Sequence, residues 1–254
     1  MSKYVISTGM LLVLIMICTV NFASAQESGP PGLSVSFDVP VLNKYILRGM
    51  PLTDGPVIQP TLIVATGNLS AAVWSNMDLD DVNGLKNEFN EVDFFIDYTT
   101  ALSGYSCTAG YSRFTFPHTQ FDDYNELYVI LVSDYTGGAS LGLFQGVGDY
   151  KGLYVSAGYE ASIPAGTTSI DISSALGWGT KKHSDLYYWG YTKSTMGDFS
   201  VGISTPIAVG NNVTLKPEAK FYSMVCSDLR NYVKDIIAID ADHFVFGITL
   251  SCSY

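Results

Sequence analysis

Residues His243 to Tyr254 read HFVFGITLSCSY and carry the clearest pattern in the sequence. Counting back from Tyr254 in twos gives an apolar and aromatic series: Cys252, Leu250, Ile248, Phe246 and Phe244. The positions between them are mostly small or polar. A repeat of two residues places the two series on opposite faces of a β-strand. The C-terminal segment is therefore predicted to be a strand with one apolar and one small, polar face.

The same alternation recurs along the chain and predicts about twelve strands. Their expected ranges are 33–41, 57–66, 69–77, 91–98, 105–116, 125–133, 139–145, 153–163, 170–178, 198–205, 213–221 and 243–254. The best helical pattern is at 228–239, but β-branched residues interrupt it, so we expect a loop there.

The links between successive strands alternate between short and long. The short links are near 67–68, 103–104, 134–138, 164–168 and 206–212, and the other links are longer on average. An even number of strands with turns at one end and longer loops at the other is typical of an outer-membrane barrel. In a soluble β-sandwich the apolar face would instead be the core. The small residues of the polar face suit a crowded barrel interior, so the sequence favours an all-β fold, a transmembrane antiparallel up-and-down β-barrel.

The composition agrees with a barrel that faces lipid. Charged residues make up 15% of the chain, against about 25% in ordinary soluble domains. Aromatic residues make up 13% of the chain, which argues against disorder. The formal net charge is −11, which argues against a nucleic-acid partner. Aromatic residues at strand ends are candidates for girdles at the membrane edges: Tyr45, Trp74, Tyr98, Tyr105, Tyr124, Tyr159, Trp178 and Tyr254.

The N-terminus predicts export. Lys3 precedes an apolar stretch over 4–20, and Ala23-Ser24-Ala25 is a small-x-small cleavage site. Residues 1–25 are therefore predicted to be a signal peptide, and 26–254 the barrel. The three cysteines after it are an odd, widely spaced set and no disulfide framework. We found no spacing typical of a metal or cofactor site, so we expect neither a metal nor a cofactor.

The segment 41–79 carries a set of short motifs with a known counterpart. It reads VLNKYILRGMPLTDGPVIQPTLIVATGNLSAAVWSNMDL. It resembles the opening of the TorF-type porin family of bacterial outer-membrane β-barrel proteins. The matching elements are Tyr45, Arg48 and Gly49, then Pro56 and Gln59, then Trp74, Ser75 and Asn76. The resemblance also covers 91–98, 111–117 and 125–128, and it implies passive passage of solutes.

Charged residues on the polar faces are the candidate pore-lining residues. They are Arg48, Asp93, Asp97, Glu160, Asp171, Lys216, Glu218 and Lys220. We expect Arg48 to point into the lumen and to pair with a carboxylate, for which the candidates are Asp38, Glu91, Asp93 and Asp97. Such a pair would either set a selective constriction or brace a filled interior, and the sequence leaves both open.

The predicted function is a narrow porin in the bacterial outer membrane, passing small hydrophilic solutes with a bias toward cations. Its expected partners are those solutes, outer-membrane lipids and lipopolysaccharide. An alternative is a non-conducting structural or surface-binding barrel that contacts lipopolysaccharide or a host. A third is a lipid-modifying enzyme using His118 with Asp122 or Asp123, or His183 with Ser184 and Asp185, but no spacing singles out a catalytic set, so we expect no enzyme.

Two loop features allow more than one interpretation of their role. Asp78, Asp80, Asp81 and Asn83 offer alternating oxygen ligands of the kind hard cations prefer, without the full pattern of a calcium loop. The loop 179–197 is rich in aromatic residues and could fold into the barrel as a plug or outward as an adhesive patch.

Overall fold

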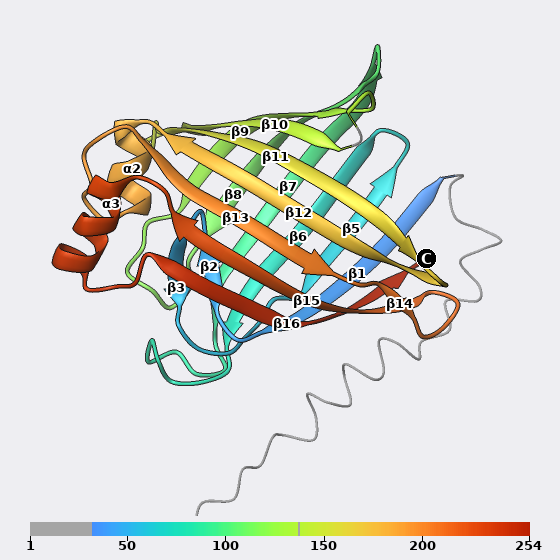
Figure 1. The fold of residues 1–254 in the computed structure, drawn as a ribbon, viewed down its shortest axis with the longest axis horizontal. Helices are drawn as coiled ribbons and strands as arrows, with labels where there is room; N and C mark the ends of the chain where they lie inside the picture. The colour runs from blue at the N-terminus through green and yellow to red at the C-terminus, as the bar shows by residue number, and fades with distance from the viewer. Residues whose placement is uncertain (1–31, 137) are drawn as a thin grey trace, which may run out of the picture. The chain divides into compact units, whose positions relative to one another are not determined.

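The computed structural model describes residues 32–136 and 138–254, and over these residues twelve strands close into an antiparallel β-barrel (Figure 1). The predicted signal peptide at 1–25 lies outside the described residues. The barrel strands are β1 Leu33–Leu42, β4 Val57–Ile58 with β5 Thr61–Thr66, β6 Leu69–Asp78, β7 Phe89–Leu102, β8 Tyr105–Thr115, β9 Tyr124–Ser133, β10 Ala139–Val147, β11 Leu153–Ala165, β12 Thr168–Gly179, β13 Thr195–Ser204, β15 Val213–Met224 and β16 Asp242–Ser253. The predicted fold class is confirmed.

Each strand pairs with its sequence neighbours, and the C-terminal strand closes the ring. In β16, Ile248 lies opposite Val41 of β1 and Pro217 of β15. On the other side of β15, Phe221 lies opposite Val201 of β13. The small strand β14 (Ile207–Ala208) folds back on β15. A closed ring leaves no free strand edge, which is what a membrane-spanning sheet requires.

The second strand of the barrel is interrupted between β4 and β5. Pro60 has no backbone N–H, so it cannot donate to a ladder at this point. Next to it, Gln59 donates from its backbone N–H to the Pro40 carbonyl oxygen and from its side chain to Asn76 Oδ1 on β6, both at 3.0 Å. The Pro-x-x-Gln element of the sequence therefore marks an interruption that a side-chain bond bridges.

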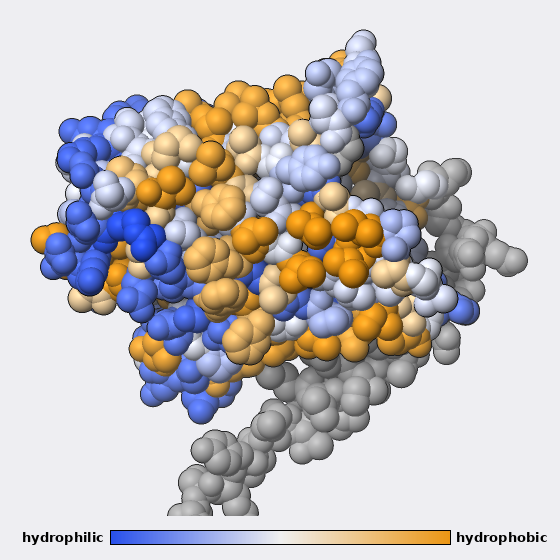
Figure 2. Space-filling view, in the orientation of Figure 1, coloured by the Kyte–Doolittle hydropathy of each residue, from blue (hydrophilic) through white to orange (hydrophobic). Residues whose placement is uncertain are grey.

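The outer surface of the barrel is apolar, as the alternation predicts. Large apolar side chains are exposed on one face of successive strands, for example Phe94 and Ile96 on β7, Leu141 and Leu143 on β10, and Phe244 and Phe246 on β16. Figure 2 shows such residues over the strands, with hydrophilic residues around the end that carries the helices. In a water-soluble barrel this face would be unusual, because contiguous exposed apolar surface is rare.

The two ends of the barrel differ in their connections. The turn end has the links 67–68, 103–104, 134–138, 166–167 and 205–212, and the loop end has the links 43–56, 79–88, 116–123, 148–152, 180–194 and 225–241. The loop end holds the hairpin of β2 (Tyr45–Leu47) and β3 (Met50–Thr53), and the helices α2 (Lys181–Tyr187), α3 (Ser227–Tyr232) and η1 (Val233–Ile237), as Figure 1 shows. In the described part of the chain no helix is long and apolar enough to cross a membrane.

The expectation of a loop at 228–239 is wrong. The segment forms α3 and the π-helical turn η1, and Leu229 and Val233 are fully buried at helical spacing. Their packing against Met50 and Met224 outweighs the low helix propensity of the β-branched residues. The left-handed Ala238 ends this helical region.

Three of the predicted girdle residues face the interior instead. Tyr45 and Tyr124 are buried. Trp74 lies on the inner face of β6, where its ring centroid is 5.4 Å from that of Tyr45. The position of an aromatic residue near a strand end does not by itself say which face it occupies, and here the inside of the loop end contains aromatic side chains too.

Candidate functional site

The hairpin β2–β3 turns at Arg48 and Gly49 and is the central feature of the loop end. Both residues have positive φ, 48° and 84°, and Leu47 pairs directly with Met50. A two-residue turn with positive φ at both positions is the type that suits a tight hairpin. A Cβ on Gly49 would lie 2.8 Å from Cβ of Asp198, so the turn also requires glycine for close packing. The Arg-Gly dipeptide of the sequence is therefore the tip of this hairpin.

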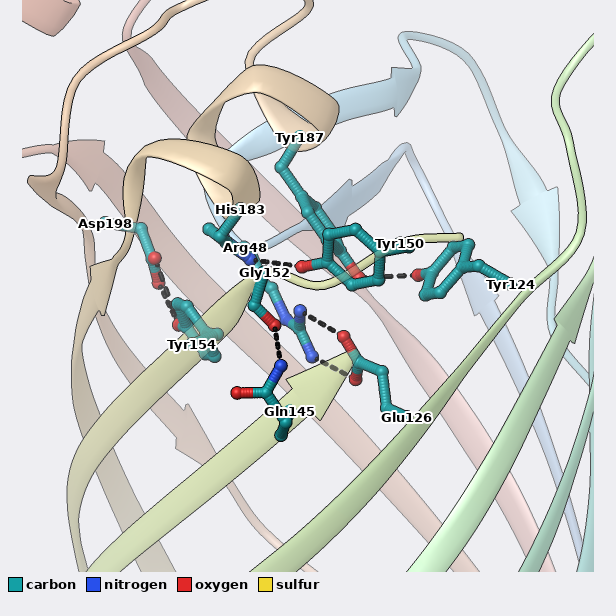
Figure 3. Close-up of polar contacts among 10 residues, drawn as sticks. All are labelled: Arg48, Tyr124, Glu126, Gln145, Tyr150, Gly152, Tyr154, His183, Tyr187 and Asp198. Carbon is teal, nitrogen blue, oxygen red and sulfur yellow. Dashed lines mark hydrogen bonds and ion pairs between the residues drawn. The ribbon is translucent and has the colours of Figure 1, made fainter. Parts of the chain in front are cut away.

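Arg48 forms a buried, bidentate ion pair with Glu126 of β9 (Figure 3). Its two guanidinium nitrogens donate to the two carboxylate oxygens at 2.9 and 2.7 Å. The side chains are 10% and 1% exposed. The guanidinium carbon also lies 4.4 and 4.5 Å from the ring centroids of Tyr154 and Tyr187. This arrangement combines a charge-assisted pair with cation–π contacts, and it holds Arg48 in an uncommon backbone conformation.

Helix α2 packs against this arginine from above (Figure 3). The His183 ring stacks between Tyr154 and Tyr187, with centroid distances of 4.8 and 4.3 Å. Its Nδ1 is hydrogen-bonded to the Tyr150 hydroxyl at 3.0 Å. Burial, together with the nearby Arg48 cation, lowers the pKa of His183 well below its usual value. His183 is therefore neutral in the folded protein, and its ring is packed between two tyrosine rings.

An apolar cluster joins the hairpin to the other loops. It contains Met50, Tyr188, Tyr191, Met224, Leu229 and Val233. Tyr188 also donates from its hydroxyl to the Arg48 carbonyl oxygen at 3.2 Å. We call the hairpin β2–β3 together with the segment 180–194 the mouth plug. The aromatic loop 179–197 thus folds inward in its central part, although Trp189 stays 44% exposed.

The inner face of β7 carries a row of carboxylates: Glu91, Asp93 and Asp97. Glu91 and Asp93 are each 3% exposed. Glu91 Oε1 and Asp93 Oδ1 have no hydrogen-bond partner among the described residues. Asp97 accepts a hydrogen bond from the Tyr128 hydroxyl. At about 3.3 Å per residue, the row extends roughly 20 Å from the loop end toward the turn end. We call it the β7 acidic row.

The turn end contains a cavity of about 590 Å³. Its lining includes the charged residues Glu160, Asp171, Lys216, Glu218 and Lys220, with serines between them. Asp171 accepts hydrogen bonds from Ser162 and Ser169 at 2.6 and 2.8 Å. Glu218 accepts one from Thr249 at 2.6 Å. These five residues come from strands β11, β12 and β15, which neighbour one another through β13.

The structure divides the eight predicted pore-lining residues into three groups. Arg48 is part of the mouth plug, Asp93 and Asp97 belong to the β7 acidic row, and the other five surround the turn-end cavity. The expected partner of Arg48 is wrong: the carboxylate is Glu126 and none of Asp38, Glu91, Asp93 or Asp97. Because the hairpin folds inside the barrel, Arg48 at its tip reaches Glu126 on β9. The order of the strands along the chain does not predict this contact.

Sequence reasoning missed Glu126 and Asp198 as interior residues. Glu126 alternates with the outward Leu127, and Asp198 accepts hydrogen bonds from the Tyr154 hydroxyl at 3.0 and 3.1 Å. In the predicted strand 125–133, the alternation of residues places Glu126 on the face opposite Leu127, and this pattern could have identified Glu126 as an interior residue. Asp198 is the first residue of the predicted strand 198–205, and at a strand end the alternation does not establish which face a residue occupies.

The loop residues that the sequence suggests for catalysis or for calcium binding make other contacts in the structure. His118 Nδ1 is 3.8 Å from Glu88 on the exposed side of the loop end. Asp78 is fully buried and accepts hydrogen bonds from Thr53, Asn76 and Asn83. Within the described residues, no group of three or more His, Cys, Asp or Glu side chains could hold a metal ion. Asp78 therefore ties the loop to the hairpin.

Comparisons with known proteins identify the fold. No protein-family profile and no curated protein sequence matches the chain. Among solved structures, the KdgM porin superposes with a TM-score of 0.54 at 12% identity, covering 86% of this chain and 99% of that chain. The NanC porin superposes with a TM-score of 0.53 at 12% identity, covering 85% and 98%. A structure of the KdgM porin in complex with disordered oligogalacturonate gives 0.52 at 10% identity, covering 87% and 99%. At this identity the likeness establishes a shared barrel fold.

Proposed function

We propose that this protein is a narrow, cation-biased channel for small hydrophilic solutes in the bacterial outer membrane. The apolar outer face would contact lipid, and the polar loop end would contact lipopolysaccharide. By the usual layout of such barrels, the turn end and the C-terminus face the periplasm. The resemblance of 41–79 to TorF-type porins and the barrel fold shared with KdgM and NanC support this proposal.

The observation that carries the cation bias is the β7 acidic row. Asp93 and Asp97 face the interior, and within the described residues no Lys or Arg forms an ion pair with them. Uncompensated carboxylates along a low-dielectric wall attract cations and repel anions. Lys216 and Lys220 lie near acidic residues at the turn end, where Glu160, Asp171 and Glu218 offset their charge.

The mouth plug determines how much can pass. The Arg48–Glu126 pair and its aromatic neighbours fill part of the interior at the loop end. A barrel of twelve strands is wider than the filled eight-stranded type and narrower than the open sixteen-stranded porins. We therefore expect small conductance steps that depend on the position of the plug.

KdgM has been solved with oligogalacturonate, which is an anionic saccharide. The corresponding solute class for this chain is different, because an acidic saccharide would be repelled along the β7 acidic row. We propose that the solutes here are neutral or positively charged.

The test is conductance and reversal potential in a planar bilayer, with protein folded in detergent. We expect discrete steps and a reversal potential that indicates cation preference in a salt gradient. The variant Asp97→Asn keeps the side-chain shape and removes the charge of the least buried member of the row, so the cation preference should fall. Asp81→Asn, in an exposed loop position, is the matched control. Anion preference in the unmodified protein would overturn the proposed bias.

The packed mouth plug also supports a second candidate, a non-conducting barrel with a structural or surface-binding role. In that case the pure protein would give no steps, and loosening the plug by mutation would create them. Heat-modifiable migration on a gel tests the barrel itself, since a folded barrel runs differently before and after boiling. Equal migration together with solubility in water would overturn the outer-membrane location.

A further inference from the structure

A second cavity lies at the loop end, and Glu91 of the β7 acidic row is part of its lining. It has a volume of about 350 Å³. Its walls come from the hairpin β2–β3, the loop 79–88, the start of β7, the loop 116–123 and Trp189. Phe121 and Trp189 are 54% and 44% exposed, so the cavity is accessible from outside. We call it the mouth cavity.

The mouth cavity has an unusual lining. Four aromatic residues, Tyr45, Phe116, Phe121 and Trp189, contribute to it, and no Lys or Arg does. Tyr45 is held by its contact with Trp74, and Phe116 by an edge-on contact with Phe121 at 5.8 Å. Aromatic rings expose a negative face, which attracts cations more strongly as water is excluded.

Glu91 is at the inner side of the same cavity. It is almost fully buried, and its Oε1 has no hydrogen-bond partner among the described residues. The Tyr45 hydroxyl is hydrogen-bonded to the carboxyl group of Glu91, and the Asp93 side chain lies within hydrogen-bonding contact of the same group. A buried carboxylate without a cation is costly. Within the described residues, no Lys or Arg forms an ion pair with this carboxyl group.

We propose that the mouth cavity is a binding site for a small organic ammonium ion. The ammonium group would pair with Glu91 Oε1, and its alkyl groups would pack against Phe121, Trp189 and the other rings. An anionic ligand would be repelled by Glu91 and Asp93. A neutral sugar would leave the carboxylate uncompensated, and a bare metal ion would leave the aromatic walls unused. This inference concerns binding at the mouth and holds whether or not the barrel conducts.

The experiment is titration calorimetry on the detergent-folded full chain with choline as the probe. Its uncharged carbon isostere neohexanol, glucose and galacturonate serve as comparison ligands. We expect saturable binding of choline, with neohexanol at least about tenfold weaker, because the attraction of the cation to Glu91 and to the aromatic rings is lost. Equal binding of choline and neohexanol, or tighter binding of galacturonate, would overturn the proposal, as would the absence of saturable binding for choline.

Variants separate the site from general effects on folding. Glu91→Gln keeps the size of the side chain and removes its charge, so choline affinity should fall about tenfold or more because the charge attraction is lost. The same change relieves the repulsion with Asp93, so resistance of the barrel to unfolding should be equal or higher. Trp189→Ala should weaken binding by a smaller factor, and Trp189→Phe should restore much of it. Asp81→Asn, whose side chain is outside the cavity, should bind like the unmodified protein.

The outcome is distinguishable from that of the channel proposal. Choline binding without conductance would support this site and overturn the channel. Conductance with cation preference but without choline binding would support the channel and overturn this site. If Glu91→Gln bound choline as tightly as the unmodified protein while remaining folded, the assignment of the carboxylate would be wrong.

Discussion

The two ends of the barrel interior contain the same kinds of charged residue in different surroundings. At the loop end, Arg48 and Glu126 are buried, bidentate and enclosed by aromatic rings. At the turn end, Lys216 and Asp171 line a cavity that contains room for water. A buried pair contributes strongly because removing one partner leaves an unpaired charge, whereas exposed pairs contribute little. The comparison leads us to expect that a charged side chain contributes much more to stability at the loop end than at the turn end.

The largest effect is expected from Glu126→Gln. This change leaves the Arg48 guanidinium buried without a counter-charge, so the free energy of unfolding should fall by about 3 kcal/mol or more. Denaturant unfolding followed by gel migration measures the loss, and larger conductance steps should accompany it as the plug loosens. Asp171→Asn at the turn end is the matched control and should leave the unfolding midpoint unchanged. An equal effect of both changes would remove the distinction between the two ends.

A pair of glycine substitutions tests packing at each end. Gly49→Ala places a methyl group against Asp198 at a residue with positive φ, so it should cost about 2 to 3 kcal/mol of unfolding free energy. Gly67 also has positive φ, 55°, but its Cβ would meet nothing within 4 Å, so Gly67→Ala should cost about 1 kcal/mol. Unfolding midpoints of the two variants give the comparison. Similar losses would mean that the hairpin tip is not tightly packed.

Acid should loosen the loop end. The pKa of His183 is lowered in the folded state, chiefly by burial, so below about pH 6.5 the unfolded segment binds more protons than the folded one. Stability that is present above this pH is therefore lost as the pH falls. Tryptophan fluorescence between pH 8 and pH 5 should report exposure of the segment that carries Trp189. In His183→Gln, this pH-dependent change should be reduced, and an unchanged pH profile would contradict the assignment.

The smallest effect on stability, with a measurable effect on transport, is expected at the turn end. Lys216→Gln and Lys220→Gln remove positive charge beside Glu160 and Glu218, so cation preference should rise about twofold while unfolding is unchanged. Reversal potentials measure the first quantity and denaturant midpoints the second. A loss of stability comparable with that of Glu126→Gln would show that this end is packed in the same way.

The strand pattern was predictable because a period of two is a local property. The expected strand 243–254 corresponds to β16, and the expected turn at 67–68 lies between β5 and β6. Likewise, Asp93 and Asp97 could be assigned to the interior because they alternate with Phe94 and Ile96, which are exposed. The helices at the loop end were not predictable, because tertiary packing stabilises α3 and η1 against their local propensities.

The sequence by itself determined that this chain forms a barrel, which residues alternate between its two faces, and that the interior is acidic along β7. These properties follow from residue order along one strand. Only the tertiary structure decided that the hairpin β2–β3 folds inward, that Arg48 pairs with Glu126, and that Glu91 lies at an aromatic cavity. Those contacts join residues far apart in the chain, and their formation depends on the closing of the ring, which no local pattern specifies.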